Sequence, residues 1–221
     1  MKKIFNLLII FLPWKIRRYI LIKFYKFQIH PTARIGFSYI YPKQLIMKEG
    51  ARIGHLNVAI HLELIQMDKN SSISQKNWIT GFPLANKSHF KDFPDRKPFL
   101  IMKEDAAITK QHLIDCTDTV TIGEFTIVAG YGTQIMSHSM SLKANRQGCA
   151  PITIGQRCFV GTRSIILPGS VLPPQSVLGA GAVMNKKFTE SFTLYGGVPA
   201  KAVQKIDETY EFFNRTIRHN A

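Results

Sequence analysis

One histidine of the chain, His138, stands where an imidazole could act as an acid–base group. Imidazole titrates near neutral pH, so it could remove a proton from a hydroxyl or an amine that attacks a substrate. Such a base is normally oriented by a second group that holds its other ring nitrogen. Asp118 lies twenty residues upstream, Asp115 twenty-three, and His112 precedes Asp115 by three. Taken alone, each aspartate is more typical of a turn, so the choice between them depends on the elements that carry them.

Those elements follow a repeat of six residues. From Ile154 to Lys187 a large aliphatic residue recurs at every sixth position: Ile154, Val160, Ile166, Leu172, Leu178 and Met184. Four places after each of the first five stands a small residue: Cys158, Ser164, Ser170, Ser176 and Ala182. No helix has this period, and a hexapeptide repeat indicates a parallel β-helix built from triangular coils of eighteen residues. The aliphatic residue would point into the prism, and the small residue would let the chain turn.

The same repeat extends upstream with two interruptions. Segments that begin at Met47, Met67 and Met102 share a pattern of Met, five residues, then Ile. The first two are twenty residues apart and the next two thirty-five, so we expect an inserted loop within 75–100. A second excursion, 139–151, follows His138, whose side chain should therefore face out of the prism. By this count Asp118 stacks about one rung below His138, with Asp115 close by. We expect about seven to eight coils.

The chain divides into three parts on these patterns. The β-helix domain is expected over 29–204, and it ends in a tight turn and an extended piece over 195–203. Ile206, Tyr210, Phe213 and Ile217 then follow helical spacing, which predicts a short helix over 205–218 within a C-terminal part, 205–221. Residues 1–28 form the N-terminal part.

Composition and charge limit the classes of partner and the compartment that we expect for the chain. The 221 residues are 45% hydrophobic with 15 glycines, which fits one folded domain, and the net charge is +15. No nucleic-acid-binding motif accompanies that charge, and the basic residues are not interleaved with stacking aromatics, so we expect no nucleic-acid partner. The three cysteines show no paired spacing, and Cys158 occupies a small-residue position of the repeat. Free thiols favour a reducing compartment, so a cytoplasmic location is expected.

Residues 1–28 carry the main local concentration of charge. They hold seven basic residues, interleaved with aliphatic and aromatic ones, and no acid precedes Glu49. The apolar run 4–12 is too short to span a bilayer and lacks the cleavage site of a signal peptide. Two compatible interpretations remain: an amphipathic helical segment lying on an anionic membrane surface, and a helix that caps the open end of the solenoid.

The repeat, the series IMSHS…PITIGQRCFVGTRSIILPGSVL…VLGAGAVMNK and the segment GGVPAK together resemble the hexapeptide-repeat acyltransferases, and most of all those that acetylate sugars of surface polysaccharides. The resemblance implies an all-β fold, a left-handed parallel β-helix, in a homotrimer with active sites between neighbouring prisms. It also implies acetyl-CoA as co-substrate, no metal, and a hydroxyl or an amine of a sugar or glycan as acceptor.

The resemblance also assigns roles to residues. His138 occupies the position of the family's catalytic histidine, and the run ITKQHLID favours Asp115 over Asp118 as its partner. His112 is either a second functional group or a buried spacer. The donor would lie against backbone at Gly161, Thr162, Gly179 and Ala180, where little bulk blocks its approach. Its phosphates would meet Lys201, which lies in the segment PAK, and the pair Lys186–Lys187. Arg96 and Arg146, on the two insertions, are candidates for a sugar-bound phosphate.

Two other classes of function remain open. A β-helix can place three histidines around zinc, but among the 7 histidines here we find no third ligand at coil spacing to join His112 and His138. A non-catalytic scaffold or binding module is the other alternative, and binding of acetyl-CoA would distinguish it from an enzyme.

Overall fold

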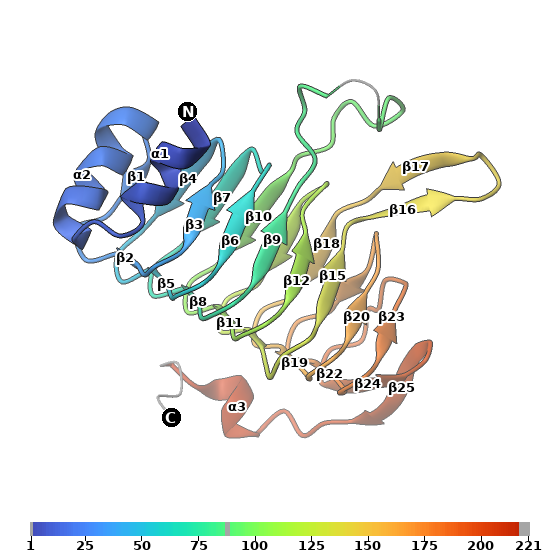
Figure 1. The fold of residues 1–221 in the computed structure, drawn as a ribbon. Coiled ribbons are helices and arrows are strands. Elements are labelled where there is room, and N and C mark those ends of the chain that lie inside the picture. The colour runs from blue at the N-terminus through green and yellow to red at the C-terminus, as the bar shows by residue number, and fades with distance from the viewer. Residues whose placement is uncertain (1, 87–88, 217–221) are drawn as a thin grey trace.

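The chain winds into a three-sided parallel β-helix (Figure 1). The computed structural model describes residues 2–86 and 89–216. Within these residues, three sheets form the faces of the prism, and seven strands stack in register on each face. The first sheet contains β1 (Gln28–Ile29), β4 (Gln44–Met47), β7 (Leu64–Met67), β10 (Phe99–Met102), β13 (Val120–Ile122), β18 (Ile152–Ile154) and β21 (Val171–Leu172).

Each coil contributes one strand to each of the three sheets, in the order first, second, third. The second sheet contains β2 (Arg34–Ile35), β5 (Arg52–Ile53), β8 (Ser72–Ile73), β11 (Ala107–Ile108), β14 (Ile127–Val128), β19 (Phe159–Val160) and β22 (Val177–Leu178), and it is extended by β24 (Thr193–Gly197) and β25 (Ala200–Lys205). The third sheet contains β3 (Tyr39–Tyr41), β6 (Val58–Ile60), β9 (Trp78–Thr80), β12 (Leu113–Asp115), β15 (Gln134–Met136), β20 (Ile165–Ile166) and β23 (Val183–Met184). The predicted number of coils is confirmed.

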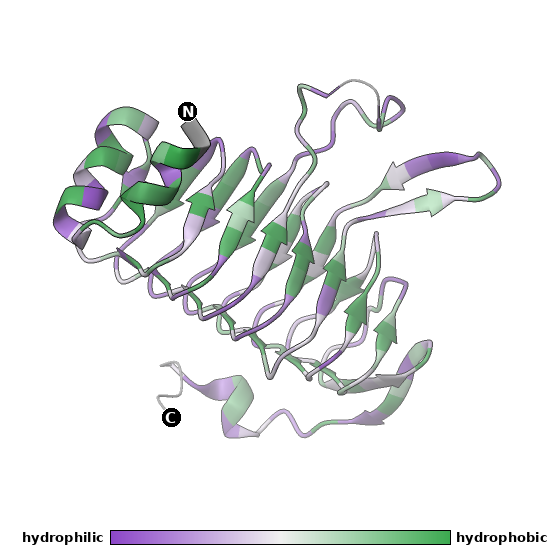
Figure 2. Ribbon diagram, in the orientation of Figure 1, coloured by the Kyte–Doolittle hydropathy of each residue, from purple (hydrophilic) through white to green (hydrophobic). Residues whose placement is uncertain are grey.

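The core is a column of aliphatic side chains inside the prism. All six hexad residues from Ile154 to Met184 have 0% exposure, and so do all five small residues of the same run. Because strand side chains alternate between the faces of a sheet, each two-residue strand points one residue inward and one outward. Figure 2 shows hydrophobic residues, in green, recurring in the strands from one coil to the next.

Two N-terminal helices close one end of the column. Helix α2 (Trp14–Tyr25) inserts Leu21 into the core, and the guanidinium of Arg17 donates to the carbonyls of Gly36 and Ser38, both at 2.7 Å. Helix α1 (Lys2–Ile9) packs against α2 and the third sheet, and Tyr41 donates to the carbonyl of Asn6 at 2.8 Å. The prediction that this segment caps the solenoid is confirmed.

Both insertions leave the prism at the corner that follows the third sheet (Figure 1). The first runs over 81–98, between β9 and β10, so the part of the predicted range before it, 75–80, belongs to a coil. The second is an antiparallel hairpin of β16 (His138–Ser141) and β17 (Arg146–Cys149). Arg146 and Asp92 join the insertions, with Nη1 and Oδ2 at 2.8 Å.

The C-terminal part differs from its predicted form. The turn and extended piece form the hairpin of β24 and β25, but helix α3 covers only Glu211–Asn214. The predicted helix over 205–218 is thus wrong in extent, because Lys205 pairs with Thr193 in a strand and Arg157 donates to the carbonyls of Phe213 and Arg215, which holds the chain against the second sheet. Ile217 lies outside the described residues.

Candidate active site

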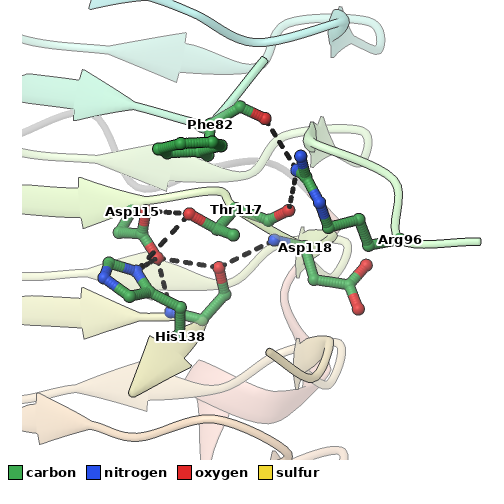
Figure 3. A network of polar contacts seen from close by, with 7 residues as sticks. Phe82, Arg96, Asp115, Thr117, Asp118 and His138 are labelled. Carbon is green, nitrogen blue, oxygen red and sulfur yellow. Dashed lines mark hydrogen bonds and ion pairs between the residues drawn. The ribbon is translucent and has the colours of Figure 1, made fainter. Parts of the chain in front are cut away.

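The centre of the site is a pair formed by His138 and Asp115. Asp115 ends β12, and His138 follows β15, the next strand of the third sheet, at the same corner. Nδ1 of His138 lies 2.7 Å from Oδ2 of Asp115 (Figure 3). A carboxylate can only accept, so in the neutral imidazole Nδ1 carries the proton and Nε2 keeps its lone pair. The dyad therefore presents Nε2 as the basic atom.

Asp115 is held by a full set of donors. It is 7% exposed, and its Oδ2 accepts from the backbone N–H of Ser137 at 3.0 Å and from the Ser137 hydroxyl at 2.9 Å. The hydroxyl of Thr117 donates to Oδ1 at 2.7 Å. Burial alone would raise the pKa of Asp115, but the hydrogen bonds from His138, Thr117 and Ser137 together lower it. Asp115 thus stays ionised beside the imidazole.

His138 is correspondingly poised. Its hydrogen bond to Asp115 raises the pKa of the imidazole above its usual value, and burial opposes this only in part. The side chain is 34% exposed, and no residue in the described part of the chain makes a hydrogen bond to Nε2. The ring edge of Phe90 meets the imidazole at 5.9 Å between centroids and 87° between planes. The base is open on one side and covered by an aromatic ring on another.

Asp118 has a different task. Its Oδ1 accepts from the backbone N–H groups of Lys97 at 3.1 Å and Thr119 at 2.7 Å, so it caps the turn where the first insertion returns. The structure therefore resolves the choice between the two aspartates in favour of Asp115 as the contact of His138.

The first insertion is fastened to the same corner by Arg96. The guanidinium donates to the carbonyls of Phe82 at 2.6 Å, Pro83 at 3.1 Å and Thr117 at 3.1 Å (Figure 3). Its carbon lies 5.0 Å from the ring centroid of Phe90. Arg96 is only 7% exposed, so it is an anchor of the loop and not the surface phosphate ligand suggested by its charge.

Between the two insertions lies a cleft of about 610 Å³. It begins beside Phe90, which contacts His138, and runs along the hairpin. Its walls are formed by His89, Phe90, Lys91, Asp92, Met140, Asn145, Arg146 and Gln147. Of the two predicted arginines, only Arg146 lines this cleft.

His112 does not join the dyad. It is 1% exposed at the corner between the second and third sheets, and its Nε2 lies 2.9 Å from the hydroxyl of Thr109. The backbone N–H of His112 donates to Oδ1 of Asn77 at 2.9 Å, and Nδ1 of His112 accepts from the N–H of Thr133 at 3.1 Å. Burial lowers its pKa to about 4. Of the two interpretations, its position fits the buried spacer.

Sequence comparisons find relatives that are named acetyltransferases. No family model matches the chain. The galactoside O-acetyltransferase of Escherichia coli is 30% identical over 94 residues, 41% of this chain and 46% of that protein. A putative acetyltransferase of Schizosaccharomyces pombe is 36% identical over 93 residues, 40% of this chain and 44% of that protein. The chain thus spans about half the length of the curated relatives it matches.

Solved structures extend the likeness to the whole fold. A hexapeptide-repeat acetyltransferase of Vibrio cholerae superposes with a TM-score of 0.51 at 22% identity, covering 64% of this chain and 73% of that one. The chain thus shares the fold of hexapeptide-repeat acetyltransferases and resembles them in sequence over part of its length. The polysialic acid O-acetyltransferase OatWY (TM-score 0.50, 17% identity, 81% and 84% covered) and an N-acyltransferase of Bacillus cereus, AntD (0.53, 11%, 87% and 88%), share the fold, a left-handed parallel β-helix.

The residues that the family resemblance assigned to the donor lie at another corner. Gly161 and Thr162 follow β19, and Gly179 and Ala180 follow β22 one coil later, between the second and third sheets. A Cβ at Gly161 would lie 2.5 Å from the backbone N of Ala180, so the two coils touch through backbone there. Side-chain bulk is therefore absent where the two coils meet at this corner.

The predicted lysines occupy two further places. Lys186 follows β23 at the corner of His138, where its ammonium lies 5.3 Å from the ring centroid of Phe188. Lys201 is exposed on β25, opposite Gly196. Within one chain the structure brings neither lysine into the His138–Asp115 network.

Sequence reasoning missed Ser137, Thr117 and Phe90. Ser137 and Thr117 are small corner residues, and only their place next to His138 and Asp115 in the chain could have pointed to them. Phe90 lies in an aperiodic loop, so no spacing relates it to the family's histidine. Among the described residues, no group of three or more His, Cys, Asp or Glu side chains could hold a metal ion.

Proposed function

We propose that the protein transfers an acetyl group from acetyl-CoA to a hydroxyl of a sugar, with His138 as general base. The observation that carries the proposal is the 2.7 Å contact between His138 and a buried, ionised Asp115. The cleft reaches Phe90, whose ring contacts the imidazole. Relatives that are named acetyltransferases, and a fold shared with hexapeptide-repeat acetyltransferases, support the reaction class.

The reaction needs one proton to move twice. Nε2 of His138 takes the proton of the acceptor hydroxyl as its oxygen attacks the carbonyl carbon of the thioester. The resulting imidazolium is stabilised by the carboxylate of Asp115, which stays ionised. The tetrahedral intermediate then collapses, the carbon–sulfur bond breaks, and the coenzyme A thiolate leaves and takes the proton from His138. The products are the acetyl ester and free coenzyme A.

Transfer is direct, without an acetyl-enzyme. All three cysteines are buried, and burial raises the pKa of Cys149 to about 11, that of Cys158 to about 12 and that of Cys116 well above its usual value. Since the thiolate is the nucleophilic form of cysteine, none of the three is suited to attack the thioester.

The active unit is a homotrimer. Gly161 and Gly179 lie at the corner before the third sheet, whereas His138 lies at the corner after it. The donor-binding backbone of one prism and the His138 base of a neighbouring prism can therefore come together between two subunits, although they lie on different corners of one prism. Lys201 and Lys186 would then bind the phosphates of the donor.

The acceptor belongs to surface polysaccharide biosynthesis. A putative lipopolysaccharide biosynthesis O-acetyl transferase of Escherichia coli, WbbJ, is 24% identical over 111 residues, 44% of this chain and 56% of that protein. The cleft beside His138 is large enough for a sugar, since ligand pockets of a few hundred cubic ångströms are typical.

The protein works against the cytoplasmic face of an anionic membrane, which it touches through α1. This helix docks by Asn6 and Ile9, while Leu8 is 62% exposed and Phe11, just beyond the helix, 71% (Figure 2). An exposed apolar face within a basic N-terminal segment is suited to an anionic bilayer surface. In the described residues no helix is long and apolar enough to cross a membrane.

Two assays test these proposals. Release of coenzyme A across a panel of sugars and lipid-linked glycans tests the reaction, and an absence of turnover together with an absence of acetyl-CoA binding would favour a scaffold. For the membrane, the variant with Leu8→Ser and Phe11→Ser should lose sedimentation with phosphatidylglycerol vesicles at low salt. Leu142→Ser, which removes a 90% exposed leucine at the hairpin tip, should sediment like the wild type. Equal sedimentation of both variants would refute the contact.

A further inference from the structure

The first insertion holds a buried cation without a carboxylate partner. The Arg96 guanidinium bonds only to carbonyl oxygens among the described residues, those of Phe82, Pro83 and Thr117. Burial lowers its pKa, which means that the site disfavours its charge. Burying a charge costs free energy unless the group is well hydrogen-bonded, so the three carbonyl contacts are what hold the Arg96 guanidinium in this place.

That geometry closes the neck of the loop. Phe82 and Pro83 begin the insertion and Arg96 ends it, so the guanidinium ties its two ends together. Lys97, the next residue, adds two hydrogen bonds at the same place. Its backbone N–H donates to Asp118 at 3.1 Å, and its carbonyl accepts from the hydroxyl of Thr119 at 2.9 Å. The closed neck is thus fastened along the turn 117–119, which directly follows Asp115.

Two contacts lead from Arg96 to the dyad. One passes through Thr117, whose carbonyl accepts from Arg96 at 3.1 Å and whose hydroxyl donates to Asp115 at 2.7 Å. The other passes through Phe90, which is 6% exposed, packs on the guanidinium at 5.0 Å and meets the imidazole edge-on at 5.9 Å. Arg96 therefore fixes the neighbours of both members of the dyad.

We propose that Arg96 is a positioning residue that holds Phe90 over His138 and so shields the Nδ1–H···Asp115 bond from water. The proposal deepens the proposed function, since it assigns a task at the same base, but it concerns a bond that exists without any substrate. Its test can therefore succeed or fail independently of acetyl transfer.

The test is the exchange of the His138 Nδ1 proton with water, followed by NMR on the full-length protein. We expect a low-field signal in slow exchange in the wild type. Arg96→Met and Phe90→Leu should each speed exchange by at least about tenfold, because local opening sets the exchange rate. Arg96→Lys, which can keep one or two of the carbonyl contacts, should recover part of the protection. Lys97→Met is the control. It also removes one positive charge, but from an exposed side chain next to Arg96 in the sequence, and it should leave the signal unchanged.

Additivity separates positioning from a general loss of structure. If Arg96 acts through Phe90, the Arg96→Met/Phe90→Leu double variant should exchange no faster than about twofold over the faster single variant, whereas independent effects would multiply. Multiplying effects, an unchanged signal in Phe90→Leu, or fast exchange already in the wild type would each overturn the proposal. Since Phe90→Leu and Arg96→Lys are mild changes, the conclusion does not depend on whether Arg96→Met folds.

Discussion

Replacing Asp115 by asparagine separates the charge of the dyad from its shape. In the wild type, four hydrogen bonds converge on the carboxylate, from His138, Thr117 and twice from Ser137. An asparagine oxygen can keep the contacts to Ser137 and His138, and the Thr117 hydroxyl can turn to accept from the new amide. The fold should survive, and what disappears is the negative charge.

The loss has a definite sign in the pH profile. The bond to Asp115 is the largest influence on His138 and raises its pKa, while burial lowers it. The base acts only when it is deprotonated, so wild-type kcat/KM should fall as the pH drops through a value above about 6.5. Without the carboxylate charge, the remaining bond to a neutral asparagine oxygen favours the imidazolium less while burial still opposes it, so the acidic limb of Asp115→Asn should move to lower pH than in the wild type. The variant should keep its residual activity to lower pH than the wild type.

The rate should fall although the base is more often deprotonated. The imidazolium formed during attack loses its counter-charge, and removal of a general base typically costs about 10²–10⁴-fold. We expect kcat to drop by about a hundredfold or more, measured by release of coenzyme A between pH 5 and 9. Asp118→Asn is the matched control, because Asp118 lies at the same corner without contacting His138. An acidic limb that stays in place or moves upward in Asp115→Asn would refute the reasoning.

Three further predictions address other parts of the molecule. Ile166→Lys should lower the free energy of unfolding by about 3–5 kcal/mol in denaturant titrations, because it buries an unpaired charge at a position with 0% exposure, whereas Ile165→Lys on the outer side of the same strand should cost far less. His112→Asn, which places an amide next to that of Asn77, should keep kcat within about threefold, and a loss of a hundredfold would support a catalytic role for His112. Lys201→Ala should raise the KM for acetyl-CoA by about 3–10-fold with little change in kcat, as expected for one lost charge-assisted contact, and an unchanged KM would remove Lys201 from the donor site.

The fold was predictable because its signal is repeated. Each hexad places one aliphatic residue inside the prism. Consecutive hexads, such as those of Leu172 and Leu178, predict the same inward position, so the prediction does not depend on any single residue. The corner residues were predictable for the same reason. The C-terminal helix was not: the spacing of Ile206, Tyr210 and Phe213 fits a helix, but packing on the second sheet and pairing with β24 override it. A segment of one turn gains too little from its own hydrogen bonds to resist such contacts.

The site was predictable only where it lies on the repeat. Counting coils brought both aspartates near the corner of His138 with Asp118 one rung below, and the resemblance of the run ITKQHLID favoured Asp115, which the register of β12 with β15 places beside His138. The task of Asp118 and the anchoring of Arg96 depend on how an aperiodic loop returns, which no period encodes. Charge suggested a surface role for Arg96, and burial against carbonyls and aromatic rings gives it a structural one.

The most direct test of the central claim is a steady-state comparison of His138→Ala with the wild type, using acetyl-CoA and an acceptor sugar, with acetyl-CoA affinity measured separately by calorimetry. The account predicts a fall in kcat of at least about a hundredfold with the dissociation constant of acetyl-CoA nearly unchanged, because Nε2 acts on the acceptor proton and does not hold the donor. A fall of less than about fivefold, or an acetylated cysteine trapped after addition of acetyl-CoA, would contradict it.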